Sequence, residues 1–184
     1  MPQDLKAHPD SPCPAVTAIR AEARRPRPGV LELRYVVSGD VGELRLAPVS
    51  ASARADELWR RTCFEAFLRG PSGEAYLELN LAPSTQWAAY RFDGYRRGMA
   101  RAELGAPPRI ETTREDGRFE LRAVVDLGQA AAGPGEGVWR LGLSAVIEEA
   151  GGRLSYWALA HPPGKADFHH PDCFALELPA PEGP

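Results

Sequence analysis

The sequence predicts an all-β domain: a two-sheet antiparallel β-sandwich of the immunoglobulin-like or jelly-roll type, with about ten strands and little helix. Apolar residues recur with a period of two in short segments, which Gly, Pro and Asp separate about every dozen residues. The 184 residues, of which 43% are hydrophobic and 26% charged, suit one domain with its own core. We expect this domain at residues 15–178, between proline-rich flexible tails at residues 1–14 and 179–184.

The expected strands are residues 31–37, 43–47, 58–68, 76–81, 86–92, 109–114, 119–126, 138–148, 154–159 and 174–178. In the first of them Leu31, Leu33 and Tyr35 alternate with charged residues or valine, as in a half-buried strand. Gly-Pro-Ser-Gly at residues 70–73 predicts a hairpin. Short helical pieces at residues 52–57 and 127–132 are also compatible with the sequence, and glycine-rich residues 133–137 predict a turn.

Charge and composition exclude two kinds of partner. The formal net charge is −3 with Arg and Lys scattered along the chain, whereas nucleic-acid binders concentrate positive charge on one face. No apolar run approaches the roughly 20 residues that span a bilayer, so we expect no membrane partner. Residues 1–14 are polar where an export signal would be apolar, which predicts a cytoplasmic protein. In that compartment Cys63 and Cys173 are expected as buried thiols, not as a disulfide.

Polar side chains fall on one face of three consecutive expected strands. Leu77, Leu79 and Leu81 form a core face, and Glu78 and Asn80 therefore point the other way. Glu65 stands in an otherwise apolar strand, and the third strand adds Trp87 and Arg91. Short connections predict that the three strands are neighbours.

Carboxylates and an amide beside indole and phenol rings suit a polyhydroxylated small molecule. Three alternatives remain. The face could be solvent-exposed, with a Glu78–Arg91 surface ion pair of little consequence. It could hold a closed Glu–His–Asp network without a ligand. It could also belong to an enzyme that acts on a sugar-like substrate through Glu65 or Glu78, with His169 as acid and base.

A loop at residues 161–174 holds three of the four histidines, two aspartates and a cysteine. Such a loop can bind a divalent metal or supply acid and base groups, although no metal-ligand spacing is present. The alternative is structural, with His169 hydrogen-bonded to a carboxylate such as Glu65. The sequence has no Gly-x-Ser-x-Gly elbow, phosphate loop or dinucleotide fingerprint. This favours a binding module over an enzyme, and we assign no catalytic residue.

Several motifs together resemble the bacterial DOMON-like proteins. They are residues 58–67, 76–80 and 83–84, then Trp87, Tyr90 and Phe92, and residues 95–99, 155–161 and 167–170. The resemblance extends over residues 31–178 and links the chain in fold to DOMON domains and family-nine carbohydrate-binding modules. It implies a β-sandwich with a ligand cleft on one sheet for a haem or a sugar.

The resemblance also implies roles for particular residues. Glu65, Glu78 and Asn80, with Trp59 and Trp87 as aromatic clamps, would hold a sugar. Met99 with His161 or His169 would ligate a haem iron. The complete set of candidate ligand-binding residues is Trp59, Glu65, Glu78, Asn80, Trp87, Arg91, His161 and His169. We expect a small-molecule binding module for a carbohydrate-like or polar metabolite, with a haem or a divalent metal as the alternative ligand.

Overall fold

The computed structural model describes residues 1–128 and 137–181, and it confirms an all-β antiparallel fold. Its strands are β1 (Gln3–Ala7), β2 (Val16–Arg27), β3 (Val30–Gly39), β4 (Cys63–Arg69), β5 (Tyr76–Leu81), β6 (Trp87–Phe92), β7 (Ala100–Arg101), β8 (Arg109–Glu115), β9 (Arg118–Asp126), β10 (Trp139–Glu148), β11 (Leu154–Ala158) and β12 (Leu176–Leu178). The helices are three short 3-10 turns, η1 (Val41–Glu43), η2 (Leu58–Arg60) and η3 (Pro171–Cys173). Among the described residues, no helix has the length and apolar character to cross a membrane.

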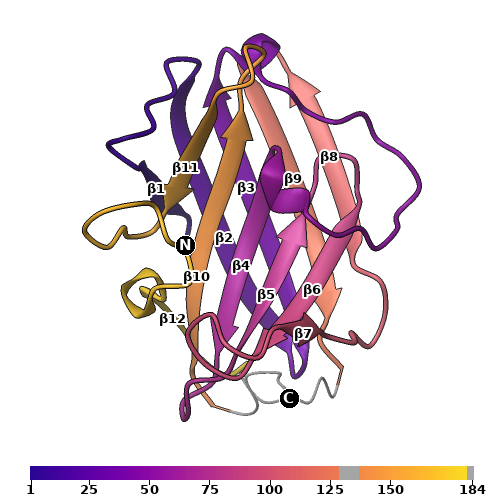
Figure 1. The fold of residues 1–184 in the computed structure, drawn as a ribbon. Coiled ribbons are helices and arrows are strands. Elements are labelled where there is room, and N and C mark those ends of the chain that lie inside the picture. Colours follow the sequence, from indigo (N-terminus) through magenta and orange to yellow (C-terminus); the bar gives the residue numbers. More distant parts are fainter. Residues whose placement is uncertain (129–136, 182–184) are drawn as a thin grey trace.

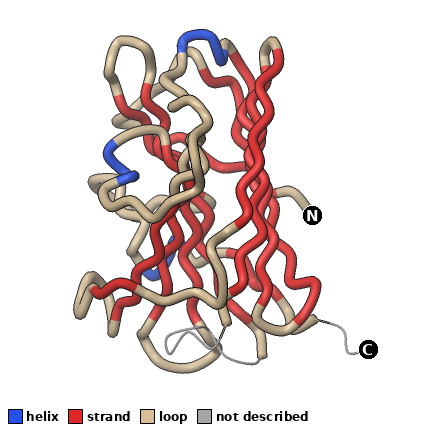
Figure 2. Tube along the Cα trace, turned by 90° about the vertical axis from the view of Figure 1, so that its right-hand side faces the viewer, coloured by secondary structure: helices blue, strands red, loops and turns tan. Residues whose placement is uncertain are grey.

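The strands form two packed layers. Their hydrogen-bonded order is β7-β6-β5-β4-β10-β11-β1-β2-β3-β9-β8, with β12 beside β10. In Figure 1, β4, β5, β6 and β10 lie in front of β2, β3 and β9. We call these the front and back layers. In the side view of Figure 2 the longer loops gather on the left, outside the front layer, and strands form the right-hand side.

The main core lies between the layers. The Tyr35 hydroxyl of β3 donates to the Glu65 carbonyl of β4 over 2.6 Å, and the Phe64 and Phe119 rings stack with centroids 5.8 Å apart. Leu77, Leu79 and Leu81 are fully buried in this core, which confirms the core face predicted for β5.

The first strand corrects the predicted boundary at residue 15. Residues 1–14 are not a flexible tail, because β1 pairs with β2 through Gln3–Leu5 and with β11 through Lys6 and Ala7. Leu5 is buried in the core. β1 therefore hydrogen-bonds to both layers. At the other end, residues 179–181 have no regular structure, and residues 182–184 lie outside the described part.

Three further expectations differ from the structure. The sequence pattern does not predict β2. Two of its buried positions are Ala21 and Ala23, which have weak strand preference, and bulges shift its pairing register at both ends. Residues 43–47 form no strand, and Leu44 makes only a single bridge to Glu149. Residues 52–57 contain no helix. The expected helix at 127–132 and turn at 133–137 fall largely outside the described residues.

We predict that Leu5→Ala lowers the free energy of unfolding by about 2–5 kcal/mol, because it removes a buried side chain from the strand that joins the layers. Urea unfolding measures this, with Asp4→Ala as the control, since Asp4 is exposed and makes only a surface ion pair with Arg20. A loss below about 1 kcal/mol for Leu5→Ala would mean that β1 is not docked in solution.

Candidate functional site

Strands β4 and β5 are buried on both faces. Their inner face meets the back layer, and every residue of both strands except Arg69 is buried. On the outer face lies a second apolar cluster made of Phe67, Tyr76, Ala88, Tyr90, Phe92, Val146, Ala158, Phe168 and Phe174. Residues from η2 and from the 161–174 loop pack against this cluster or belong to it. The outer face is therefore covered by other segments of the protein. It is not the solvent-exposed polar face of the first alternative.

A pocket of about 380 Å³ lies within this covering. It is lined by Trp59, Glu65, Glu78, Phe92, Arg96, Met99, Val146, Tyr156, Ala166, Phe168 and His169. Met99 is about half exposed (51%), whereas the two glutamates are 2% and 4% exposed. The pocket thus has acidic groups at its buried end and aromatic rings on its walls.

The buried end carries polar atoms that the protein only partly satisfies. The Asn80 side-chain amide donates to Glu78 Oε1 over 2.8 Å. Within the described residues, Glu65 Oε1 has no hydrogen-bond partner. Ser144, which pairs with Glu65 across β4 and β10, likewise has a buried hydroxyl without a partner among them. Unpaired buried polar groups cost on the order of 1–3 kcal/mol each, so they point to a missing partner.

His169 is held rigidly above these carboxyl groups. Its Nδ1 is 2.8 Å from the Tyr76 hydroxyl, whose oxygen also accepts the backbone N–H of Arg96. We assign the hydroxyl hydrogen of Tyr76 to His169 Nδ1, which places the imidazole proton on Nε2. The Nε2–H of His169 then faces Glu78 Oε2, at 3.8 Å. The rings of Phe67 and Phe92 pack against the imidazole with centroids 5.0 and 5.1 Å away.

Burial sets the protonation of the site. It lowers the pKa of His169 to about 4 and raises the pKa of Glu78 to about 7. Burial, followed by repulsion from Glu78, raises the pKa of Glu65 well above its ordinary value. At neutral pH His169 is consequently uncharged and the carboxyl pair retains protons. The His169–Glu78 contact is a polar contact and not an ion pair.

Asp167 joins the two loops over the pocket. It accepts hydrogen bonds from the backbone N–H of His169 at 3.1 Å, from Arg96 at 2.7 Å and from the Tyr95 hydroxyl. Burial alone would raise the pKa of Asp167, but the hydrogen bonds from Tyr95 and Arg96 hold it below its ordinary value. The ionised carboxylate therefore positions both His169 and Arg96 at the pocket.

The structure brings together five of the eight candidate residues. Trp59, Glu65, Glu78 and His169 line the pocket, and Asn80 lies behind Glu78. The lining residues that the candidate list omitted are Phe92, Arg96, Met99, Val146, Tyr156, Ala166 and Phe168. Arg96, Met99, Ala166 and Phe168 lie outside strands, where no strand period applies, whereas Phe92, Val146 and Tyr156 lie in β6, β10 and β11.

Three candidates lie elsewhere. Trp87 pairs with Leu81, so it faces the main core, where the Arg54 guanidinium lies 4.5 Å from its ring centroid. Arg91 pairs with Leu77, is exposed and contacts Asp93, so the Glu78–Arg91 ion pair of the solvent-exposed alternative does not form.

His161, the third of these candidates, bonds the Lys6 carbonyl away from the pocket. The prediction chose the wrong face of β6. The face opposite Trp87 and Arg91 carries Tyr90 and Phe92 toward the site.

The site does not suit a haem or a metal ion. His169 has Nδ1 bonded to Tyr76 and Nε2 directed at Glu78, and Met99 sits at the half-exposed wall. The buried end is acidic, where a porphyrin would need apolar walls. In the part of the chain that the structure describes, no three His, Cys, Asp or Glu residues group as metal ligands would. The three cysteines are free and buried.

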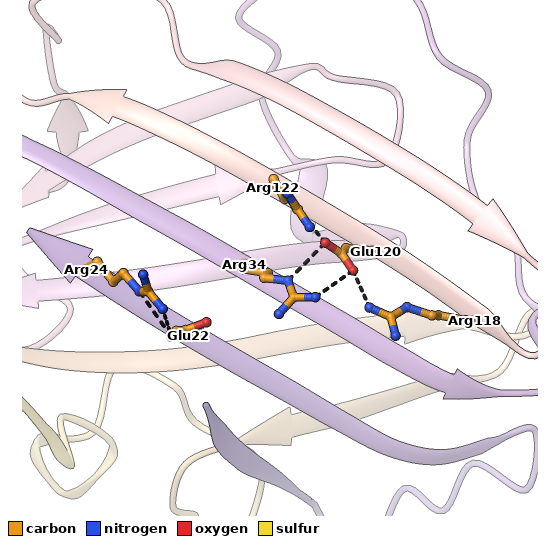
Figure 3. A network of polar contacts seen from close by, with 6 residues as sticks. All are labelled: Glu22, Arg24, Arg34, Arg118, Glu120 and Arg122. Carbon is orange, nitrogen blue, oxygen red and sulfur yellow. Dashed lines mark hydrogen bonds and ion pairs between the residues drawn. The ribbon is translucent and has the colours of Figure 1, made fainter. Parts of the chain in front are cut away.

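A second hollow, of about 480 Å³, lies on the outer face of the back layer. Figure 3 shows the ion pairs around it: Glu120 lies among Arg34, Arg118 and Arg122, and Glu22 pairs with Arg24. Hydrogen bonds from Arg34 above all lower the pKa of Glu120 to about 2. No aromatic ring lines the hollow among the described residues. Because the hollow lacks the aromatic walls of the first pocket and Glu22 and Glu120 already have arginine partners, it is the weaker candidate.

Comparison with known proteins gives structural neighbours only. No protein-family model and no curated protein matches the sequence. A crystal structure of a Bacteroides uniformis protein to which carbohydrate binding is ascribed matches with a TM-score of 0.67 at 15% identity, over 98% of this chain and 86% of that one.

A family-nine carbohydrate-binding module of Caldicellulosiruptor kristjanssonii also matches. Its complex with glucose has a TM-score of 0.52 at 12% identity, over 96% of this chain and 84% of that one. Its complex with cellotriose has the same TM-score and identity, over 96% and 83%. The likeness is one of fold. The relation in fold to carbohydrate-binding modules that the sequence motifs implied is thereby supported.

We predict that Glu78→Gln changes how stability depends on pH. The unfolded chain loses the Glu78 proton near pH 4.5 and the folded protein near pH 7, so this group's contribution to stability falls as pH rises between these values. The stability of the parent protein relative to Glu78→Gln should therefore drop by about 2–3 kcal/mol across that interval. Urea unfolding at several pH values measures it, with exposed Glu111→Gln as control. If the difference in unfolding free energy between the parent and Glu78→Gln does not change with pH, the Glu78 carboxyl group is exposed to water.

Proposed function

We propose that the pocket over β4 and β5 binds a small saccharide or a similar polyhydroxylated metabolite. The observation that carries this proposal is the arrangement of aromatic rings around buried, partly unsatisfied carboxyl groups. Trp59, Tyr156 and Phe168 offer faces for the C–H surfaces of a sugar ring. Glu65 and Glu78 at the buried end offer acceptors for its hydroxyl groups.

The polar groups also match a hydroxyl-rich ligand in number and kind. A hydroxyl both donates and accepts. Glu65 Oε1 can accept a hydrogen bond from a ligand hydroxyl, and the Nε2–H of His169 can donate one. A purely apolar ligand would leave these groups unpaired, at a cost in free energy.

Pocket size limits the length of the ligand. About 380 Å³ lies in the lower part of the usual range for small-molecule pockets, roughly 300–1,000 Å³. A short saccharide therefore suits it better than an extended polymer. The structural neighbours that hold glucose and cellotriose support a saccharide in preference to other hydroxylated metabolites. We further propose, from the sequence motifs, that the chain is a DOMON-like domain.

Trp59→Ala should weaken saccharide binding at least tenfold, because it removes an aromatic wall of the pocket. Titration calorimetry with mono- and disaccharides measures the affinity, and a thermal melt checks the fold, which should change little since Trp59 is only partly buried. The matched control is Arg24→Ala in the hollow on the back layer. Loss of binding in the control and not in Trp59→Ala would move the site to the back layer.

The alternative of a ligand-free structural network differs in what it predicts for ligand binding. Asn80→Ala removes a buried hydrogen bond to Glu78, which costs about 1–3 kcal/mol of stability in either case. If the pocket binds saccharides, saturating ligand should raise the melting temperature of the parent protein. If no saccharide shifts the parent's melting temperature and Asn80→Ala only destabilises it, the cluster is structural and the proposed function is wrong.

A further inference from the structure

Two acidic side chains share the buried end of the pocket. Glu65 pairs with Asn80 across β4 and β5, which makes Glu78 its diagonal neighbour on the same face. Both side chains line the pocket and both are nearly inaccessible to solvent. Two carboxyl groups this close in a buried site repel each other when both ionise.

The protein leaves one oxygen on each carboxyl group open. In the described part of the chain Glu65 Oε1 has no partner. Glu78 Oε1 accepts from Asn80, but Glu78 Oε2 is 3.8 Å from His169 Nε2, beyond hydrogen-bond length. Two carboxyl groups, each with an oxygen that no donor of the described residues reaches at hydrogen-bond length, therefore line the same cavity.

No arginine or lysine in the described residues pairs with either carboxyl group. Arg96 is the basic residue that lines the pocket, and its guanidinium is held by Asp167 at 2.7 Å. His169 is uncharged at neutral pH because burial lowers its pKa. The pair thus has no directly bonded cation among the described residues, although the charge of Arg96 lowers the pKa of Glu78 against the larger effect of burial.

The walls of the pocket also favour a cation. Trp59, Tyr156, Phe92 and Phe168 line the same cavity as the two carboxyl groups. The faces of aromatic rings attract ammonium groups, by about 0.5–2 kcal/mol per contact. A neutral hydroxyl group gains nothing comparable from these rings.

We propose that the ligand carries a protonated amine and that the pocket takes amino sugars, with the ammonium group between Glu65 and Glu78. This inference rests on the proposed function, since it names the ligand class of the same site. An ammonium group has three N–H donors and a positive charge. It can bind the open oxygens of both carboxyl groups and compensate their charges once their protons are released, whereas one hydroxyl supplies a single donor and no charge.

The test compares glucosamine, glucose and N-acetylglucosamine by titration calorimetry at neutral pH. These probes share the sugar ring, and acetylation removes the charge of the amine while keeping its nitrogen. We expect glucosamine to bind at least tenfold more tightly than glucose, and N-acetylglucosamine to lose that advantage.

Glu65→Gln then tests the role of the charge, since it keeps the shape of the side chain. It should reduce the ratio of glucosamine to glucose affinity toward one. The control Glu111→Gln, on the back layer, should leave the ratio unchanged.

The outcomes separate the two proposals. If glucose or N-acetylglucosamine binds as tightly as glucosamine, the amine inference is overturned and the saccharide pocket stands. If the preference for glucosamine persists in Glu65→Gln, the ammonium group does not lie at the carboxyl pair and the inference fails. If none of the three sugars binds, the proposed function falls and the inference falls with it.

Discussion

Burial of β4 and β5 on both faces is the constraint on which the site depends. A sheet with one wet face can place carboxyl and amide groups in water at no cost, but these strands cannot. Glu65, Glu78 and Asn80 therefore have to find partners inside the protein or in a ligand. The shifted pKa values of the two glutamates and the open oxygen of Glu65 are direct consequences of this packing.

The covering that buries these strands is made of loops, and polar contacts hold the loops in place. Asp167 bonds both Arg96 and the backbone of His169, and Tyr76 joins the imidazole to the Arg96 backbone. The strands supply the acidic groups and two of the wall rings, Phe92 and Tyr156, while η2 adds Trp59 and the 161–174 loop adds Phe168.

Strand alternation sufficed to predict the faces of β5, because one side is wholly leucine and the other is polar. It failed for β6, where Trp87 lies on one face and Tyr90 and Phe92 lie on the other, so pattern alone could not choose. The sequence pattern did not predict β2, because its core positions include alanines. β1 is a strand because it pairs with residues distant in the chain, such as Ala158, and a local sequence pattern cannot predict such pairing.

The hydrogen-bonded path of strands ends at β7 and β8, and the three-residue β12 branches from it at β10. β7 has only two residues, and β8 (Arg109–Glu115) is largely exposed and carries charged side chains along its length. A short edge and a charged edge are both poor templates for a strand from another molecule. Neither end of the sheet therefore offers a good template for edge-to-edge pairing with a second molecule.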